Sequence, residues 1–180
     1  YLDDLIELIK LPGKARRTTV HDEIVIPADA LPLAGPHGAP SGLDPAKFPG
    51  VVLDDKQAKL VGKWNKGQGL KPYFGFGYLY ASAPATATFS LEAPKDGKYE
   101  VRIVYQPHPN RGQSVPVTVK VGDQEQAFSI DMRKAAPIEN GFFPLGSYEL
   151  AKGKTAKVTI SSKGAKGNAH VDAAQLIPIK

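Results

Sequence analysis

The alternation of apolar and polar residues predicts a run of short β-strands through most of the chain. The clearest case is residues 99–105 (YEVRIVY), where every second residue from Tyr99 onward is aromatic or aliphatic. A period of two is typical of a strand with one buried face. Similar patterns predict strands at 51–55, 58–64, 78–81, 85–91, 115–121, 126–130, 142–150, 156–161 and 169–178.

The segments between these strands are rich in turn residues, including Asp96-Gly97, Gly122-Asp123 and Lys152-Gly153-Lys154. Short strands at intervals of roughly eight to fifteen residues, joined by such turns, favour a β-sandwich or barrel over helical folds. We therefore predict an all-β fold, a jelly-roll β-sandwich, over residues 51–180.

The first fifty residues have a different pattern. Residues 1–11 (YLDDLIELIKL) place apolar side chains at helical spacing and end at Pro12-Gly13, which predicts a short amphipathic helix. A strand is plausible at 18–26. Residues 27–50 carry six prolines with few large side chains, a composition typical of an extended linker. We expect residues 1–50 to be the end of a neighbouring domain plus a Pro-rich linker, in a chain that is a fragment of a longer protein.

Composition narrows the classes of partner. The chain has 180 residues, a net charge of +5 and a pI near 9.3, but its Lys and Arg are scattered, which argues against a nucleic-acid site. The same diffuse positive charge would attract an anionic polysaccharide. The absence of Cys excludes disulfides, thiolate nucleophiles and cysteine zinc sites, and the lack of an eighteen-residue apolar stretch argues against membrane insertion.

Aromatic residues gather between Trp64 and Ser82, interleaved with glycines. Sugar-binding sites use flat aromatic faces beside amide, carboxylate or Arg side chains. Tyr73 and Phe74 follow Pro72 in an expected loop and are the better stacking candidates. Trp64 and Tyr78 suit either a binding face or the core.

Two further groups of polar residues are candidates for binding. Asn110 and Arg111 end a proline-stiffened loop, where the Arg fork can grip a carboxylate or hydroxyls, or else pin the loop by bonding backbone carbonyls. Asp54, Asp55 and Asp172 open and close the sandwich. Converging carboxylates would suit a structural calcium, and the alternative is solvated turn residues with Asp172 accepting backbone hydrogen bonds.

Catalytic motifs are missing. The chain has no G-x-S-x-G, no H-E-x-x-H, no phosphate loop and no dinucleotide fingerprint. Ser114, His108 and Asp131 can be assembled into a triad only on paper. We expect no catalysis by this chain.

The ordered set VVLDD, GYLYAS, APKDGKYEVRIVY, PHPNRGQSVPVTV, GFFPLGSYEL, AKGKTAKVTIS and HVDAAQLIP resembles the golvesin and xanthan-lyase type of carbohydrate-binding-like domain. Asn110-Arg111 and Val171-Asp172-Ala173 are its more specific marks. The resemblance covers residues 51–178 and departs at Phe142-Phe143-Pro144, where relatives carry a Trp beside an amide residue.

The resemblance implies a β-sandwich accessory module of a bacterial secreted enzyme. Its expected function is to bind a polysaccharide, through Trp64, Tyr73, Phe74, Tyr78, Asn110 and Arg111, and to hold a parent catalytic domain near that polymer. The alternative is a module that packs against its parent and binds no sugar. The start of the chain is similar to the end of a flavin-dependent oxidoreductase, and the expected location is secreted or periplasmic.

Overall fold

A computed structural model of the chain describes residues 42–179. These residues lie in one compact unit that begins at Pro40 and is built from antiparallel strands with three short 3-10 turns, η1 (Pro45–Lys47), η2 (Asp55–Gln57) and η3 (Glu139–Gly141). The predicted all-β sandwich is confirmed. The predicted helix at 1–11, the strand at 18–26 and the linker up to residue 41 lie outside the described residues. In the described part, no helix is long and apolar enough to cross a membrane.

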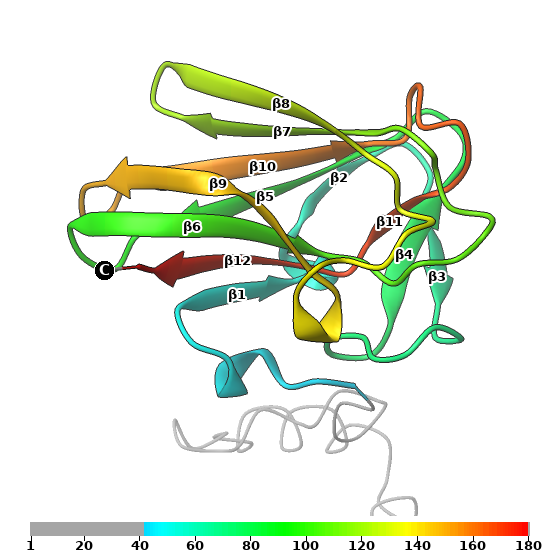
Figure 1. Cartoon of the computed structure of the whole chain (residues 1–180), viewed down its shortest axis with the longest axis horizontal. Coiled ribbons are helices and arrows are strands. Elements are labelled where there is room, and N and C mark those ends of the chain that lie inside the picture. Colours follow the sequence, from blue (N-terminus) through cyan, green and yellow to red (C-terminus); the bar gives the residue numbers. More distant parts are fainter. Residues whose placement is uncertain (1–41, 180) are drawn as a thin grey trace, which may run out of the picture. The chain divides into compact units, whose positions relative to one another are not determined.

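Two sheets form the sandwich (Figure 1). The four-stranded sheet has the order β1 (Val51–Asp54), β12 (Ala173–Pro178), β6 (Gly97–Val104) and β9 (Phe142–Leu150). The five-stranded sheet has the order β2 (Lys59–Val61), β5 (Thr86–Glu92), β10 (Thr155–Ser161), β7 (Val115–Val121) and β8 (Gln124–Ile130). All pairings within these sheets are antiparallel.

A third, smaller sheet lies at one end of the sandwich, with the order β11 (Ala169–Val171), β4 (Tyr78–Ala81) and β3 (Asn65–Gly67). The sequence predicted one strand over residues 169–178, but the chain breaks it at Asp172 and passes from the small sheet into the four-stranded sheet. It also gave no strand at 65–67, because a Gly-ended polar triplet carries no alternation.

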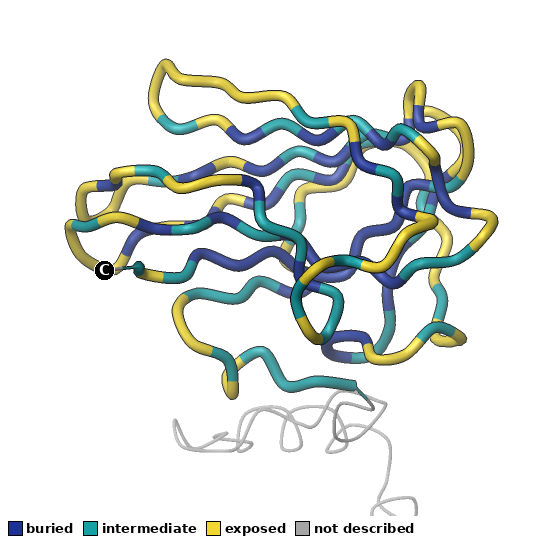
Figure 2. The backbone as a smooth tube through the Cα atoms, in the orientation of Figure 1, coloured by how far each residue is buried: buried dark blue, intermediate teal, exposed yellow. Residues whose placement is uncertain are grey.

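The core lies between the two large sheets, and burial alternates along each strand as the period of two requires (Figure 2). On β7, Val115, Val117 and Val119 are fully buried, while Thr118 and Lys120 point outward. The inward face of β6 contributes Tyr99, Val101 and Ile103. The alternation read from the sequence therefore identifies the core face correctly.

Residues 42–50, which the sequence assigned to the linker, pack on this unit. Leu43 forms a bridge with Phe74, and the Phe48 ring lies 4.9 Å from the Phe74 ring and 5.7 Å from the Phe142 ring. The packed unit therefore begins before the predicted boundary at residue 51. The Pro-rich composition masked this, since two anchoring side chains, Leu43 and Phe48, are enough to hold the segment against the unit.

Candidate functional site

The three-stranded sheet brings aromatic and polar side chains onto one face. Tyr80 on β4 lies opposite Asn65 of β3 and His170 of β11, and Tyr78, two residues along, lies opposite Gly67. Successive side chains of a strand alternate between faces, so these residues share one side of the sheet. Leu79 and Val171 point the other way and join the main core.

Arg111 and His170 complete what we call the Arg111 cluster, formed by Tyr78, Tyr80, Arg111 and His170. The Arg111 guanidinium carbon is 5.4 Å from the centres of both tyrosine rings. The His170 ring stacks on Tyr78 at 4.3 Å with an interplanar angle of 25°. A Cβ at Gly67 would lie 2.5 Å from the Tyr78 ring, so only glycine lets that ring lie against β3. The geometry is that of a cation held by two aromatic rings.

The loop that carries Arg111 is fixed to the end of the sandwich. Residue 111 forms a bridge with Asn168, and the side-chain amide of Asn168 donates to the carbonyl of Asn110 at 3.1 Å. Asn110 itself is exposed, and its Oδ1 lies 2.7 Å from Nδ1 of His108. The loop is therefore pinned by the Asn168 amide and by backbone bonds, and not by the side chains of Asn110 and Arg111 as the second alternative required. A ligand gripped by the Arg111 fork stays a prediction.

The charge of Arg111 is buried without an acidic partner. Its side chain is 4% exposed, its Nη1 donates to Asn110 Oδ1 at 3.4 Å, and its Nε has no hydrogen-bond partner. Burial lowers its pKa, an effect that the two tyrosines partly offset. No ion pair to Arg111 occurs among residues 42–179. A buried cation with a free donor is costly unless a ligand or water pairs with it.

Like Arg111, His170 is buried, and its ring has no hydrogen-bond partner. It is 0% exposed, neither ring nitrogen has a partner, and its pKa is well below the ordinary value because of burial and the nearby Arg111 charge. The imidazole is therefore neutral and carries one free donor and one free acceptor. Sequence reasoning missed this residue. A signal was available: His170 lies two residues before Asp172 in a predicted strand, so the two share the face opposite to that of the inward Val171.

The two preferred stacking residues are not at the surface, and their prediction as ligand contacts is wrong for this structure. Tyr73 is 3% exposed and Phe74 is 0% exposed. Phe74 packs between Phe48 and Phe142, and the Tyr73 ring meets Tyr78 edge-on at 6.4 Å. Aromatic rings after a proline were assigned to an open loop, but residues 42–48 cover that loop.

Trp64 and Tyr78 take intermediate positions. Trp64 is half-buried, packs against the main core, and donates through Nε1 to the carbonyl of Thr86 at 3.3 Å. Tyr78 is 5% exposed and lies within the Arg111 cluster. Its more exposed neighbour Tyr80 is the aromatic face of the cluster that solvent reaches. The structure thus brings together Tyr78, Asn110 and Arg111 of the predicted set and leaves Trp64 elsewhere.

The three predicted carboxylates lie near one another. Asp54 ends β1 opposite Ala173, next to Asp172, and the pKa of Asp172 is raised well above its ordinary value by burial and by the charges of Asp54 and Asp55. Asp172 accepts a hydrogen bond from the backbone N–H of Phe74 at 2.9 Å, as one half of the alternative to calcium predicted. The other half is wrong, because Asp54 and Asp55 are buried and therefore are not solvated turn residues. Burial and the neighbouring Asp54 raise the pKa of Asp55 to about 7.

These carboxylates suit calcium only in part. Oδ1 of Asp54 and Oδ2 of Asp172 are buried and unpaired, and such hard oxygen atoms are the ligands that calcium prefers. However, across residues 42–179 no three His, Cys, Asp or Glu side chains are grouped so that they could hold a metal ion. Calcium at Asp54, Asp55 and Asp172 stays a prediction.

Ser114, His108 and Asp131 do not form a catalytic triad in the structure. Ser114 donates to the carbonyl of Gly164 at 3.3 Å, and Asp131 holds Arg133 through two bonds of 2.8 Å. His108 is engaged with Asn110. These partners leave no serine–histidine–aspartate relay among the three residues.

The profile of the golvesin C-terminal domain matches residues 51–177. A xanthan lyase from Bacillus sp. (strain GL1) is 26% identical over 127 residues, which are 66% of this chain and 13% of that protein. The chain therefore spans about an eighth of the length of this relative.

Two solved structures share the fold. The Paenibacillus xanthan lyase has a TM-score of 0.65 at 21% identity, over 72% of this chain and 13% of that one. A family 35 carbohydrate-binding module from Clostridium thermocellum has a TM-score of 0.52 at 14% identity, over 72% of this chain and 98% of that one. At these identities the likeness concerns the fold.

Proposed function

Because this chain belongs to the golvesin C-terminal domain family, we propose that it is an accessory module that binds a polysaccharide and performs no chemistry itself. The fold it shares with a carbohydrate-binding module, and with part of an enzyme of which it spans only a small share, supports this reading. Its task is then to hold a parent catalytic domain near the polymer, where a weak site gains from tethering. That task places the protein outside the cytoplasm, secreted or periplasmic. A flavin-dependent parent stays a prediction.

The unpaired charge of Arg111 is the observation that carries the proposal. A carboxylate on a sugar ring would supply the countercharge that the described residues do not. The exposed Asn110 and the half-buried Tyr80 lie beside it. Asn110 offers an amide for the sugar hydroxyls, and Tyr80 offers a ring edge for the C–H face. We therefore propose an anionic polysaccharide as the ligand.

Arg111 is too buried to be reached across its whole surface. The ligand enters at the exposed Asn110, whose Oδ1 already accepts from Arg111 Nη1, and the neutral His170 lies behind on Tyr78. In this arrangement Asn110 and Tyr80 contact the ligand, while Arg111 supplies the charge that selects a carboxylate. Binding by such a site depends on a fixed loop, which the Asn168 contacts provide.

The test is titration of the protein with polygalacturonate, xanthan and a neutral glucan by calorimetry in 0.15 M salt. We expect saturable binding to the anionic polymers, weakened about tenfold or more in Arg111→Gln, which removes the charge, and in Asn110→Ala. Lys120→Ala, on the outer face of β7, removes an equal charge from a distant surface and should leave binding unchanged. Equal loss in Lys120→Ala, or loss of all binding at 0.5 M salt, would reduce the interaction to diffuse charge.

A module that packs against its parent without binding sugar is the second candidate. Its support is the buried state of Tyr73 and Phe74, together with Leu60 and Val61 on the edge strand β2, which are 42% and 59% exposed. Exposed apolar residues on an edge strand are typical of contact surfaces. Absence of binding to every polymer, in a protein that is folded, would favour this second function.

A further inference from the structure

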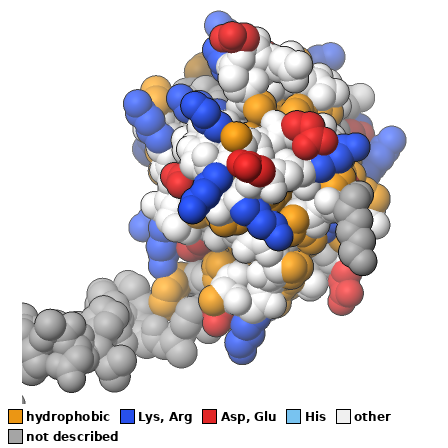
Figure 3. Space-filling view, turned by 90° about the vertical axis from the view of Figure 1, so that its left-hand side faces the viewer, with side chains coloured by type: hydrophobic (Ala, Val, Ile, Leu, Met, Phe, Trp, Pro, Cys, Tyr) orange, Lys and Arg blue, Asp and Glu red, His pale blue; other side chains and the backbone are white. Residues whose placement is uncertain are grey.

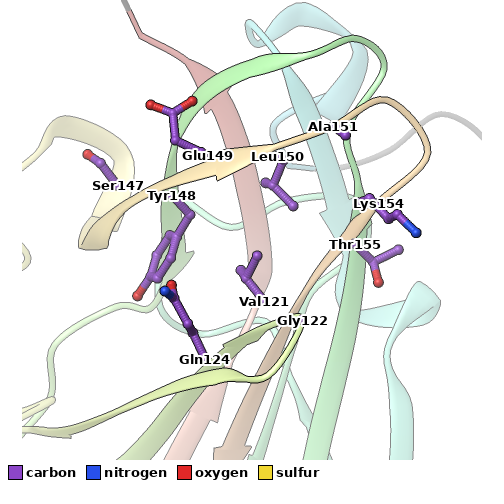
Figure 4. A pocket seen from close by; sticks show the side chains of 10 residues that line it. All are labelled: Val121, Gly122, Gln124, Ser147, Tyr148, Glu149, Leu150, Ala151, Lys154 and Thr155. Carbon is purple, nitrogen blue, oxygen red and sulfur yellow. The ribbon is translucent and has the colours of Figure 1, made fainter.

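A groove lies at the end of the sandwich away from the Arg111 cluster. β9 is the last strand of the four-stranded sheet and β8 the last of the five-stranded sheet, so neither has a neighbour on that side. Between β9 and the β7–β8 turn the structure leaves a cavity of about 720 Å³ (Figure 4). This volume is within the range of sites that bind small molecules. We call it the edge groove.

The lining of the edge groove is amphipathic. In Figure 4, Tyr148 and Leu150 point into it from β9, while Glu149, between them, points away. Val121 faces Leu150 from the opposite sheet, and Gln124 reaches up beside the tyrosine ring. The groove therefore offers an apolar floor, one aromatic wall and one free amide.

The aromatic wall is held in place before any ligand arrives. The Tyr148 hydroxyl lies 2.9 Å from the carbonyl of Leu145 and 2.9 Å from Oε1 of Gln126, and its ring packs against the main core. A fixed ring loses little conformational entropy on binding. Burial also raises the Tyr148 pKa, so the hydroxyl stays protonated at neutral pH.

The charges around the groove favour a neutral ligand. Glu149 and Lys154 border it with opposite signs, and the surrounding surface shows basic and acidic side chains interspersed with apolar ones (Figure 3). Unlike the Arg111 cluster, the groove holds no buried unpaired charge. A pyranose ring has an apolar C–H face for Tyr148 and Leu150 and hydroxyls for Gln124 and Thr155.

We propose that the edge groove is a second saccharide site, which takes a neutral sugar residue of a polysaccharide chain. The ring lies over Val121 and Leu150 with one face against Tyr148, and the Gln124 amide bonds its hydroxyls. The inference rests on the proposed function for the class of ligand only, since the two sites share no residue. Two sites at opposite ends of the sandwich let the module cross-link or follow a polymer.

The experiment is an amide NMR titration of the whole chain with cellohexaose and maltohexaose as neutral probes and trigalacturonate as the anionic probe. Neutral oligosaccharide should shift the amides of residues 121–124 and 147–150, and trigalacturonate those of residues 108–111. The two sets are separate, so failure of one proposal is visible apart from failure of the other.

Variants assign the groove contacts. Tyr148→Ala should weaken neutral binding at least tenfold, while Tyr148→Phe, which keeps the ring, should retain it within about threefold. Gln124 is exposed, so Gln124→Ala should fold normally and weaken binding several-fold. Its neighbour Glu125 lies opposite Lys120 of β7 on the outer side of the sheet, and the Glu125→Ala protein should bind as the unaltered protein does.

Three outcomes would overturn the proposal. The first is no shift in residues 121–124 or 147–150 at millimolar concentrations of either neutral probe. The second is unchanged neutral binding in both Tyr148→Ala and Gln124→Ala. The third is equal weakening by Glu125→Ala and Gln124→Ala, which would show that the effect comes from the strand and not from the groove.

Discussion

Replacing Asp55 by Asn should stabilise the protein, and more so as the pH rises. Burial and the nearby Asp54 raise the Asp55 pKa from its ordinary 3.8 to about 7, so the folded state holds this proton more tightly than the unfolded state. Stability linked to a raised carboxyl pKa is present at low pH and is lost as the pH rises through the folded value. Asn keeps the shape of the side chain and never ionises.

The magnitude follows from the shift. About three pKa units at 1.36 kcal/mol each give a cost of about 4 kcal/mol for the ionised carboxylate at pH 8, as an upper bound. At pH 5 the folded state is still protonated while the unfolded state is mostly ionised, and the cost is about 2 kcal/mol. The advantage of Asp55→Asn should therefore grow by about 2–3 kcal/mol between pH 5 and pH 8.

The assay is urea unfolding in chelator, followed by the fluorescence of Trp64, the single tryptophan, at several values of pH. Each variant is compared with the unaltered protein at the same pH, so the opposing contribution of His170 cancels. Asp123→Asn, which makes the same substitution in the exposed β7–β8 turn, is the control for removing one carboxylate outside the buried group. If Asp55→Asn is no more stable than the unaltered protein at pH 8, the carboxylate is not destabilising and the reasoning fails. If added calcium alone reverses the sign, the predicted calcium site gains its first support.

Three other predictions follow from buried contacts. Because burial and Arg111 lower the pKa of His170 well below its ordinary 6.5, its ring should still be neutral at pH 6.5, and ring carbon shifts that titrate near that pH would contradict this. Phe74→Ala should lower the free energy of unfolding by about 3–5 kcal/mol in urea, since the ring is fully buried between two phenylalanines, and a loss below 1 kcal/mol would show that it is not part of the core. Gly75→Ala should cost more than about 1 kcal/mol, because Gly75 has φ +58° and a Cβ there would lie 2.6 Å from Oδ2 of Asp54; Gly122→Ala, at a similar φ with no atom nearby, should cost less in the same assay.

The strands of the sandwich could be predicted from sequence because one physical rule governs them. Where a strand has one buried face, as in residues 99–105 and 115–121, the period of two specifies both its existence and its orientation. The rule fails for β3, which has no apolar alternation, and for the break at Asp172. Val171 and Ala173 are both fully buried although they belong to different sheets, so nothing in the pattern marks the crossing.

The candidate site could be predicted only in its residue types. Arg111 and Asn110 were visible because a proline-stiffened loop with an Arg fork is a local feature. Their partners Tyr80 and His170 come from strands far apart in sequence, and pairing of β4 with β11 is a property of the topology. The prediction of Tyr73 and Phe74 as ligand contacts was wrong for the same reason. The segment that buries them lies some thirty residues earlier and has the composition of a linker.

Tyr73 and Phe74 connect two groups of buried ionisable residues, the three carboxylates and the Arg111 cluster. Phe74 donates its backbone N–H to Asp172, and the adjacent Tyr73 ring meets Tyr78 of the Arg111 cluster. From the other side, Val171 alone separates Asp172 from His170, which stacks on the same Tyr78. The carboxylates and the Arg111 cluster are thus connected twice, once through Phe74 and Tyr73 and once through Val171. Because each group is buried and incompletely paired, we expect a change of charge in one group to be felt along these contacts by the other.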